Sequence, residues 1–197
     1  MSTGGQAIAQ NRARRRAQEQ TATRAAILEA ARKVGARDGA RHLSLRAVAA
    51  EAGFAPAALY GYFRNKDELL LALAADDLSL VARAMRDAGL NAPPAEKLEA
   101  AALAAVRLLQ QTETLATAPA ALSGGLAPDA ERIFNGRLIA ALRSLSDAAS
   151  IPMESRDSQL DTVLLAATLT GLAVMARSGR LGALGFSAEE IVARLKT

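Results

Sequence analysis

The chain has 197 residues, half of them apolar and only 3% aromatic, which is enough for one sizeable core or for a small domain joined to a larger one. It has no cysteine, which excludes disulfides and thiolate metal sites. Its charge is uneven: residues 1–66 hold 12 Lys and Arg against 4 Asp and Glu, whereas residues 67–197 hold 12 against 16. A basic end indicates contact with a polyanion, and a solvated tail with no partner is the alternative.

Residues 1–20 are polar, rich in Gly, Arg and Gln, and lack the apolar spacing of a helix. We therefore expect them to be disordered in isolation. Basic arms of this kind can gain order in a minor groove or along phosphates. The arginines assigned to the arm are Arg12, Arg14, Arg15 and Arg16.

The next stretch, residues 21–66, has the pattern of three short helices. Thr21 or Thr23 can cap the first helix, and Gly39 ends it in a left-handed conformation. Ser44 caps the second helix, and Gly53 provides the turn before the third. The residues expected to form the core are Ile27, Ala31, Val34, Leu45, Val48, Ala49, Leu59 and Phe63. Such a helix-turn-helix places its second helix in the DNA major groove, so this stretch is predicted to be a DNA-binding domain.

A long fourth helix starts at a capping box formed by Asn65 to Glu68 and continues to about Met85. The composition of residues 67–197 predicts further helices, at Ala95–Glu113, Leu115–Leu122, Pro128–Ala149, Ser155–Ser178 and Ala188–Lys196, the last one capped by Ser187. The fold class is therefore all-α. The longest uncharged run, residues 162–176, is shorter than the ~20 residues of a membrane span, and no secretory signal is recognised. We expect a cytoplasmic protein with no membrane partner.

Three segments carry a resemblance to a known family: TRAAILEAARKVGARDG, SLRAVAAEAGF and LYGYFRNKDELL, in this order between about Thr21 and Leu73. The chain resembles the tetracycline-repressor (TetR) family of bacterial regulators over its first third. The resemblance implies a homodimer, with an N-terminal three-helix DNA-binding domain and a C-terminal helical domain for effector binding and dimerisation. It also implies a near-palindromic double-stranded operator, repression, and release by a small-molecule effector, here unknown, with no cofactor.

Residues at matching positions are expected to contact phosphate, namely Ser44, Arg46, Tyr60, Tyr62 and Lys66. The start of the third helix departs from the family pattern, because it consists of Ala55, Pro56, Ala57 and Ala58. None of these side chains can hydrogen-bond a base edge, although alanine can contact a thymine methyl group. We expect specificity to come from methyl contacts, DNA shape and the arginine arm, which includes Arg14, Arg15 and Arg16.

Candidates for the effector pocket are apolar residues of the C-terminal helices, namely Met85, Leu103, Phe134, Leu138, Leu165, Leu169 and Met175. Each of these residues could instead pack in an ordinary hydrophobic core. Their residue types favour this alternative over a ligand contact. The run of residues 162–176 is apolar nearly all round, and small or short residues on it permit close helix approach. The residues assigned to a dimer interface are Ala166, Thr170, Gly171 and Ala173; in a monomer, the same helix would lie at the centre of the core.

Two other functions compete with a ligand-responsive regulator. An enzyme is disfavoured, because the chain has one histidine, His42, and no phosphate-binding glycine loop or metal-ligand spacing. The second rival is an architectural or corepressor-dependent DNA-binding protein without an inducing ligand. The small recognition helix favours this rival, and the large apolar C-terminal half disfavours it.

Overall fold

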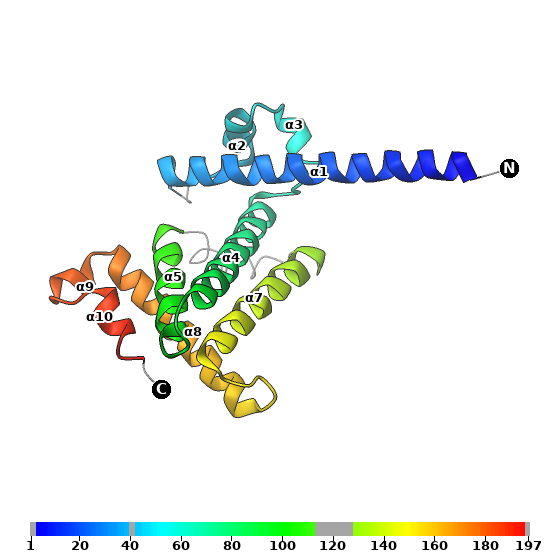
Figure 1. The fold of residues 1–197 in the computed structure, drawn as a ribbon. Coiled ribbons are helices and arrows are strands. Elements are labelled where there is room, and N and C mark those ends of the chain that lie inside the picture. The colour runs from blue at the N-terminus through cyan, green and yellow to red at the C-terminus, as the bar shows by residue number, and fades with distance from the viewer. Residues whose placement is uncertain (1–2, 40–41, 113–127, 196–197) are drawn as a thin grey trace. The chain divides into compact units, whose positions relative to one another are not determined.

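The computed structural model describes residues 3–39, 42–112 and 128–195, and its regular elements in these ranges are all helices (Figure 1). This confirms the predicted all-α fold. The elements are α1 (Thr3–Asp38), α2 (Leu45–Ala52), α3 (Pro56–Leu59), α4 (Lys66–Asn91), the 3-10 turn η1 (Pro94–Glu96), α5 (Lys97–Gln111), α7 (Pro128–Ala149), α8 (Arg156–Arg177), α9 (Arg180–Ala183) and α10 (Ala188–Val192). The helix predicted at Leu115–Leu122 lies outside the described residues.

The chain divides into two compact units, Met1–Leu69 and Leu70–Thr197. In the first unit, α1 packs on α2 and α2 packs on α3. The predicted core of this unit is confirmed: its members are all less than 9% exposed, and Ile27, Val34, Val48 and Leu59 are fully buried.

Helix α1 differs from the prediction, because it begins at Thr3 and includes the residues predicted to be a disordered arm. Thr21 lies inside the helix, where its Oγ1 donates a hydrogen bond to the carbonyl of Ala17 at 2.8 Å, and is not a cap. The side chains of residues 10–22 are all exposed, so tertiary packing does not support this part of the helix. Its composition explains it instead, since alanine, arginine and glutamine are strong helix formers.

Gly53 ends α2 with φ +73°, and the amide of the next residue, Phe54, donates to the Ala49 carbonyl at 2.9 Å. This left-handed ending reverses the chain between the two helices of the motif. A Cβ at this position would touch nothing within 4 Å, so only the backbone conformation resists substitution.

We expect Gly53→Ala to lower the free energy of unfolding of the first unit by about 1–2 kcal/mol, because left-handed φ values strain residues with a Cβ. Gly35→Ala is the matched control, since Gly35 lies within α1 and a Cβ there also meets nothing within 4 Å. That variant should be neutral or stabilising by about 0.5–1 kcal/mol. Urea unfolding followed by circular dichroism compares the two, and equal effects would contradict the strain argument.

In the second unit, α5 contacts α7, α8 and α10, and α8 also contacts α7 and α9. One apolar core joins these helices to the part of α4 between Leu71 and Met85. Helix α7 has the predicted bounds, and Ser155 caps α8 by accepting a hydrogen bond from the Ser158 amide. The capping box at α10 is complete between Ser187 and Glu190, although this helix is shorter than predicted.

Candidate nucleic-acid interface

The helix-turn-helix is built from α2, the Gly53 turn and α3. The Oγ of Ser44 accepts a hydrogen bond from the Ala47 amide at 3.2 Å and so caps α2 as predicted. Leu59 and Phe63 are at most 1% exposed, and they fix α3 to the core of the first unit. Arg46 is exposed in the first turn of α2.

The outward side of α3 is made of small apolar residues. Its N-cap is Ala55, which makes no side-chain cap, and Pro56 is its first residue. Ala57 and Ala58 are exposed with these two residues. After the helix come Tyr60, which is 56% exposed, and the half-buried Tyr62. Along the chain, this surface therefore presents methyl groups on α3 and then the phenol hydroxyls of the two tyrosines that follow it.

The start of α4 is held by two reciprocal hydrogen bonds. The Oδ1 of Asn65 accepts from the Glu68 amide at 2.8 Å, and Glu68 Oε2 accepts from the amide of Arg64 at 2.8 Å. Asn65 therefore caps α4 as predicted, while Glu68 bonds to the residue before the cap. Lys66 is the first residue of this helix and is half-buried.

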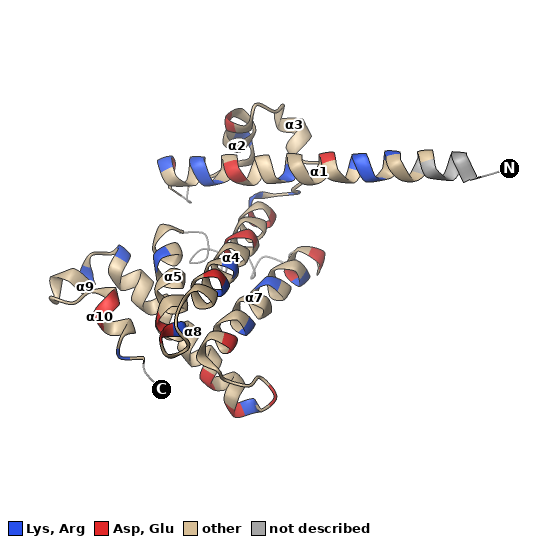
Figure 2. Ribbon diagram, viewed as in Figure 1, with Lys and Arg blue, Asp and Glu red and all other residues tan. Residues whose placement is uncertain are grey.

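Basic residues recur along α1 (Figure 2). The side chains of Arg12, Arg14, Arg15 and Arg16 on this helix are all exposed. Further along the helix, the guanidinium of Arg24 lies 5.3 Å from the centre of the Phe63 ring. This cation–π contact links α1 to the segment between α3 and α4.

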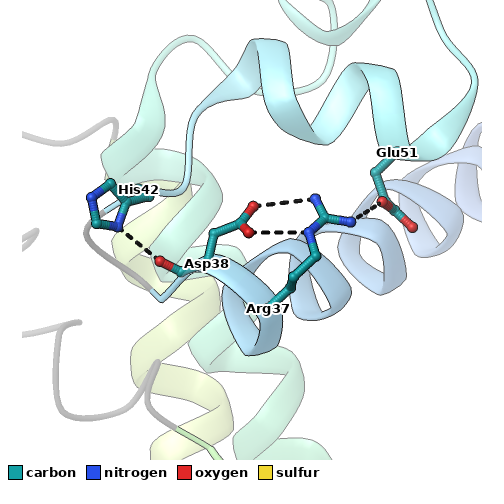
Figure 3. A network of polar contacts seen from close by, with 4 residues as sticks. All are labelled: Arg37, Asp38, His42 and Glu51. Carbon is teal, nitrogen blue, oxygen red and sulfur yellow. Dashed lines mark hydrogen bonds and ion pairs between the residues drawn. The ribbon is translucent and has the colours of Figure 1, made fainter.

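A polar network joins the end of α1 to α2 (Figure 3). Arg37 donates from Nη1 to Glu51 at 3.0 Å and from Nε and Nη2 to the carboxylate of Asp38 at 3.1 and 3.2 Å. His42 Nδ1 lies 2.8 Å from the Asp38 carbonyl oxygen, to which it donates, because a carbonyl oxygen only accepts. The single histidine therefore has a structural partner.

Hydrogen bonds from Arg37 lower the pKa of Asp38. Because folding lowers this pKa, the stabilisation is present above the pKa of the unfolded chain and is lost as the pH falls through the lower folded value. We expect Asp38→Asn to lower Tm slightly at pH 7, since the pair is exposed. The difference should shrink below about pH 4. A difference that persists at pH 2 in calorimetry would contradict a charge-based cause.

A pocket of about 220 Å³ lies inside the second unit, between α4, α5, α7 and α8. The predicted candidates that line it are Met85, Phe134, Leu138 and Leu169. Three others do not: Leu103 lines a separate hollow, Leu165 packs half-buried on the core, and Met175 lies on the exposed side of α8. The lining residues that the sequence analysis did not assign to it are Leu78, Val81, Ala105, Leu109, Ala141, Leu142, Leu145, Ala166 and Thr170.

Helix α8 presents a second apolar surface, which we call the outer face of α8. Its large members are Leu160, Val163, Leu164, Val174 and Met175, with Leu164 67% exposed. Of the residues predicted for the dimer interface, Gly171 is exposed on this helix, whereas Ala173 is 2% exposed in the core. Ala166 and Thr170 line the pocket. Ala173 therefore packs within its own chain, which leaves it almost no surface to offer a partner.

By length and composition alone, α8 is also apolar enough to cross a membrane, with a mean hydropathy of 1.5 over an 18-residue window. The helix is longer than the uncharged run of residues 162–176, from which no membrane span was predicted. Core helices of soluble proteins have the same property. Here one side of α8 packs on α5 and α7.

Among the residues that the structure describes, no group of three or more His, Cys, Asp or Glu side chains could hold a metal ion. Residues 27–73, which span the helix-turn-helix and the start of α4, match the family model described as bacterial regulatory proteins, tetR family. This segment is therefore similar to the DNA-binding segment of the TetR family.

Solved TetR-family structures are similar over most of the chain. A TetR transcriptional regulator from Rhodococcus sp. RHA1 has a TM-score of 0.68 at 22% identity, covering 89% of this chain and 94% of its own. The fatty acid degradation regulator FadR from Bacillus halodurans has a TM-score of 0.59 at 20% identity, covering 86% and 93%. The regulator PfmR from Thermus thermophilus has a TM-score of 0.59 at 22% identity, covering 84% and 89%. The chain thus has the fold of these transcriptional regulators.

Proposed function

We propose that this protein is a cytoplasmic TetR-type repressor that binds a near-palindromic operator as a homodimer and is released by a small-molecule effector. The observation that carries the proposal is the pairing of an exposed helix-turn-helix in one unit with an apolar pocket in the other. The first supplies a DNA contact and the second a ligand site, which are the two parts that a ligand-responsive regulator needs.

Five residues are proposed to position the protein on the DNA backbone: Ser44, Arg46, Tyr60, Tyr62 and Lys66. Three features support them. Arg46 and Tyr60 are exposed, the caps at Ser44 and Asn65 fix the two helix starts, and a helix N-terminus attracts phosphate. Arg14, Arg15 and Arg16 extend the basic surface along α1. Such contacts give affinity and register without sequence information.

Sequence discrimination is proposed to depend on methyl contacts from α3. The exposed side chains of Ala55, Ala57 and Ala58 end in methyl groups, and thymine is the base that presents a methyl group in the major groove. The ring of Pro56 adds apolar surface beside them. No side chain of α3 can donate a hydrogen bond to a base. The remaining sequence discrimination is therefore proposed to come from DNA shape and from the arginines of α1.

We expect replacement of the contacted thymines by deoxyuridine to weaken operator binding by roughly 3–10-fold per base, because this removes a methyl group and retains base pairing. Operators selected from a random library provide the sites, and titration of singly substituted duplexes measures the effect. Substitution of thymines outside the selected motif is the control. Unchanged affinity would mean that the arginine arm discriminates between DNA sequences. An Arg14→Ala, Arg15→Ala double variant should then lose this discrimination.

The homodimer is proposed to form through the outer face of α8. Leu160, Leu164, Ala167, Gly171 and Val174 recur at intervals of four and three residues, which is the spacing of a helix that packs against another helix. A contiguous apolar surface of this kind is a typical protein contact site. Two-fold pairing would give two helix-turn-helix units per dimer and explain a near-palindromic operator.

The proposal is tested by fluorescence anisotropy of the purified protein with DNA from upstream of its own gene and a scrambled duplex, across a salt series. Selective binding to the upstream DNA supports an operator-binding regulator. Equal and steeply salt-dependent binding to both duplexes supports the architectural alternative. The apolar pocket favours the regulator, since an architectural protein needs no ligand site.

A further inference from the structure

We propose that the effector is an uncharged, largely aliphatic molecule with at most one hydroxyl group. This rests on the proposed function, in which the pocket between α4, α5, α7 and α8 holds the effector. The chemistry of the pocket lining, its volume and the placement of the nearby arginines lead to this class of ligand.

The described lining of the pocket consists of alanine, valine, leucine, methionine and phenylalanine side chains, with Thr170 as its single polar member. None of these described residues is charged. A carboxylate or ammonium group bound here would lose its hydration without gaining an opposite charge, which is strongly unfavourable. An apolar ligand incurs no such desolvation cost, and apolar cavities bind apolar molecules readily.

Thr170 sets the limit on ligand polarity. Its Oγ1 donates a hydrogen bond to the Ala166 carbonyl at 2.8 Å, so its proton is already engaged. The oxygen can still accept one hydrogen bond. A ligand hydroxyl can donate to it, whereas a ligand carbonyl or carboxylate finds no side-chain donor in the described lining.

The volume of about 220 Å³ sets the size. A cavity of ~150 Å³ lined by similar side chains holds benzene, so this pocket fits a somewhat larger molecule. Leu138 and Thr170 are both partly exposed, which places the opening between α7 and α8.

The basic side chains near the pocket lie on a separate surface. Arg83, Arg86 and Arg137 line another hollow, together with Asp76 and Ala140. Arg86 is oriented there by its hydrogen bond to Ser144 at 2.9 Å. Ala140 lines the hollow that contains the arginines, whereas the next residue of α7, Ala141, lines the apolar pocket. The helix α7 therefore lies between the arginines and the pocket.

Methyl-labelled methionine provides the test. Met85 is 3% exposed and lines the pocket, whereas Met175 lies on the outer face of α8 and Met153 contacts Thr162 through its sulfur. NMR spectra of the full-length protein with ¹³C-methyl methionine are recorded during titration with 1-hexanol. Hexanoate at pH 8 is the charged counterpart of the same length. We expect 1-hexanol to shift the Met85 methyl resonance saturably, with Met153 unchanged, and hexanoate to shift none.

Three results would overturn the inference: hexanoate shifts Met85 as strongly as 1-hexanol, 1-hexanol shifts Met175 without Met85, or 1-hexanol shifts neither up to its solubility. Ala141→Leu should abolish the Met85 shift by filling the pocket, and Ala140→Leu is the matched control that should retain it. Thr170→Val, which is nearly isosteric, should weaken 1-hexanol binding by about 3–10-fold and leave toluene binding unchanged. Unchanged Met153 and Met175 resonances show that each variant is folded.

Anisotropy with operator DNA separates this inference from the proposed function. A Met85 shift without release of the operator supports the ligand class and refutes effector-released repression. Operator binding with no Met85 shift refutes the ligand class alone. A protein that binds the ligand but no DNA refutes the proposed function.

Discussion

The Leu164→Glu variant is expected to be monomeric and to bind operator DNA at least about 100-fold more weakly than the wild type. Leu164 is 67% exposed on the outer face of α8. In a two-fold dimer, each interface would contain this position twice, so the substitution would bury two carboxylates among apolar side chains. A monomer binds only one half-site. In a dimer, binding of the first subunit raises the effective concentration of the second subunit at its own half-site, and a monomer loses this gain.

Sedimentation equilibrium measures the oligomeric state, and anisotropy measures operator affinity. Leu90→Glu is the matched control, because Leu90 is also exposed but lies at the end of α4. This control should remain dimeric and bind normally. A dimeric Leu164→Glu protein would place the interface elsewhere, and a monomeric wild type that binds palindromic DNA tightly would refute the dimer proposal.

The second large effect is expected from the proposed phosphate contacts of Tyr60 and Lys66. Loss of both should weaken binding to operator and scrambled DNA alike by roughly 10–100-fold, because phosphate contacts carry no sequence information. The two substitutions should differ in salt dependence. Lys66→Ala removes a charge from each subunit and should reduce the slope of log K against log salt by about 2 per dimer, whereas Tyr60→Phe should leave the slope unchanged.

Arg143→Ala is the control for charge alone, since Arg143 is exposed on α7 in the second unit. It should leave both affinity and slope unchanged. If Arg143→Ala and Lys66→Ala weaken binding equally, net charge and not a specific phosphate contact explains the effect. If Tyr60→Phe has no effect at any salt concentration, the hydroxyl does not reach the backbone.

Local signals in the sequence predicted the first unit well, because caps and turns are determined by a few neighbouring residues. The caps at Ser44 and Asn65, the left-handed Gly39, the turn at Gly53 and the buried Leu59 and Phe63 all form as predicted. Residues 3–20 are the exception, because polarity predicted disorder while helix propensity favoured the helix that α1 forms.

The longer helices of the second unit were predictable, whereas the short α9 and the use of the helix faces were not. Helix α8 is apolar nearly all round, so periodicity cannot tell which side enters the core. Ala173 was therefore placed on a surface, and the exposed Leu160 and Leu164 were overlooked although they follow a repeating four-three spacing. The pocket lining depends on which helices meet, and this is why Met85 and Phe134 were found while Ala141 was not.

The two tyrosines that follow α3 make the proposed DNA contact optically distinct from the rest of the protein. Tyr60 and Tyr62 are the only tyrosines of the chain, which contains no tryptophan. Light absorbed near 280 nm, and the emission that follows, therefore arise almost entirely from the helix-turn-helix unit. Tyrosine emission of the unmodified protein can therefore report operator binding. An effector that enters the apolar pocket should leave this emission unchanged unless the DNA-binding unit itself changes.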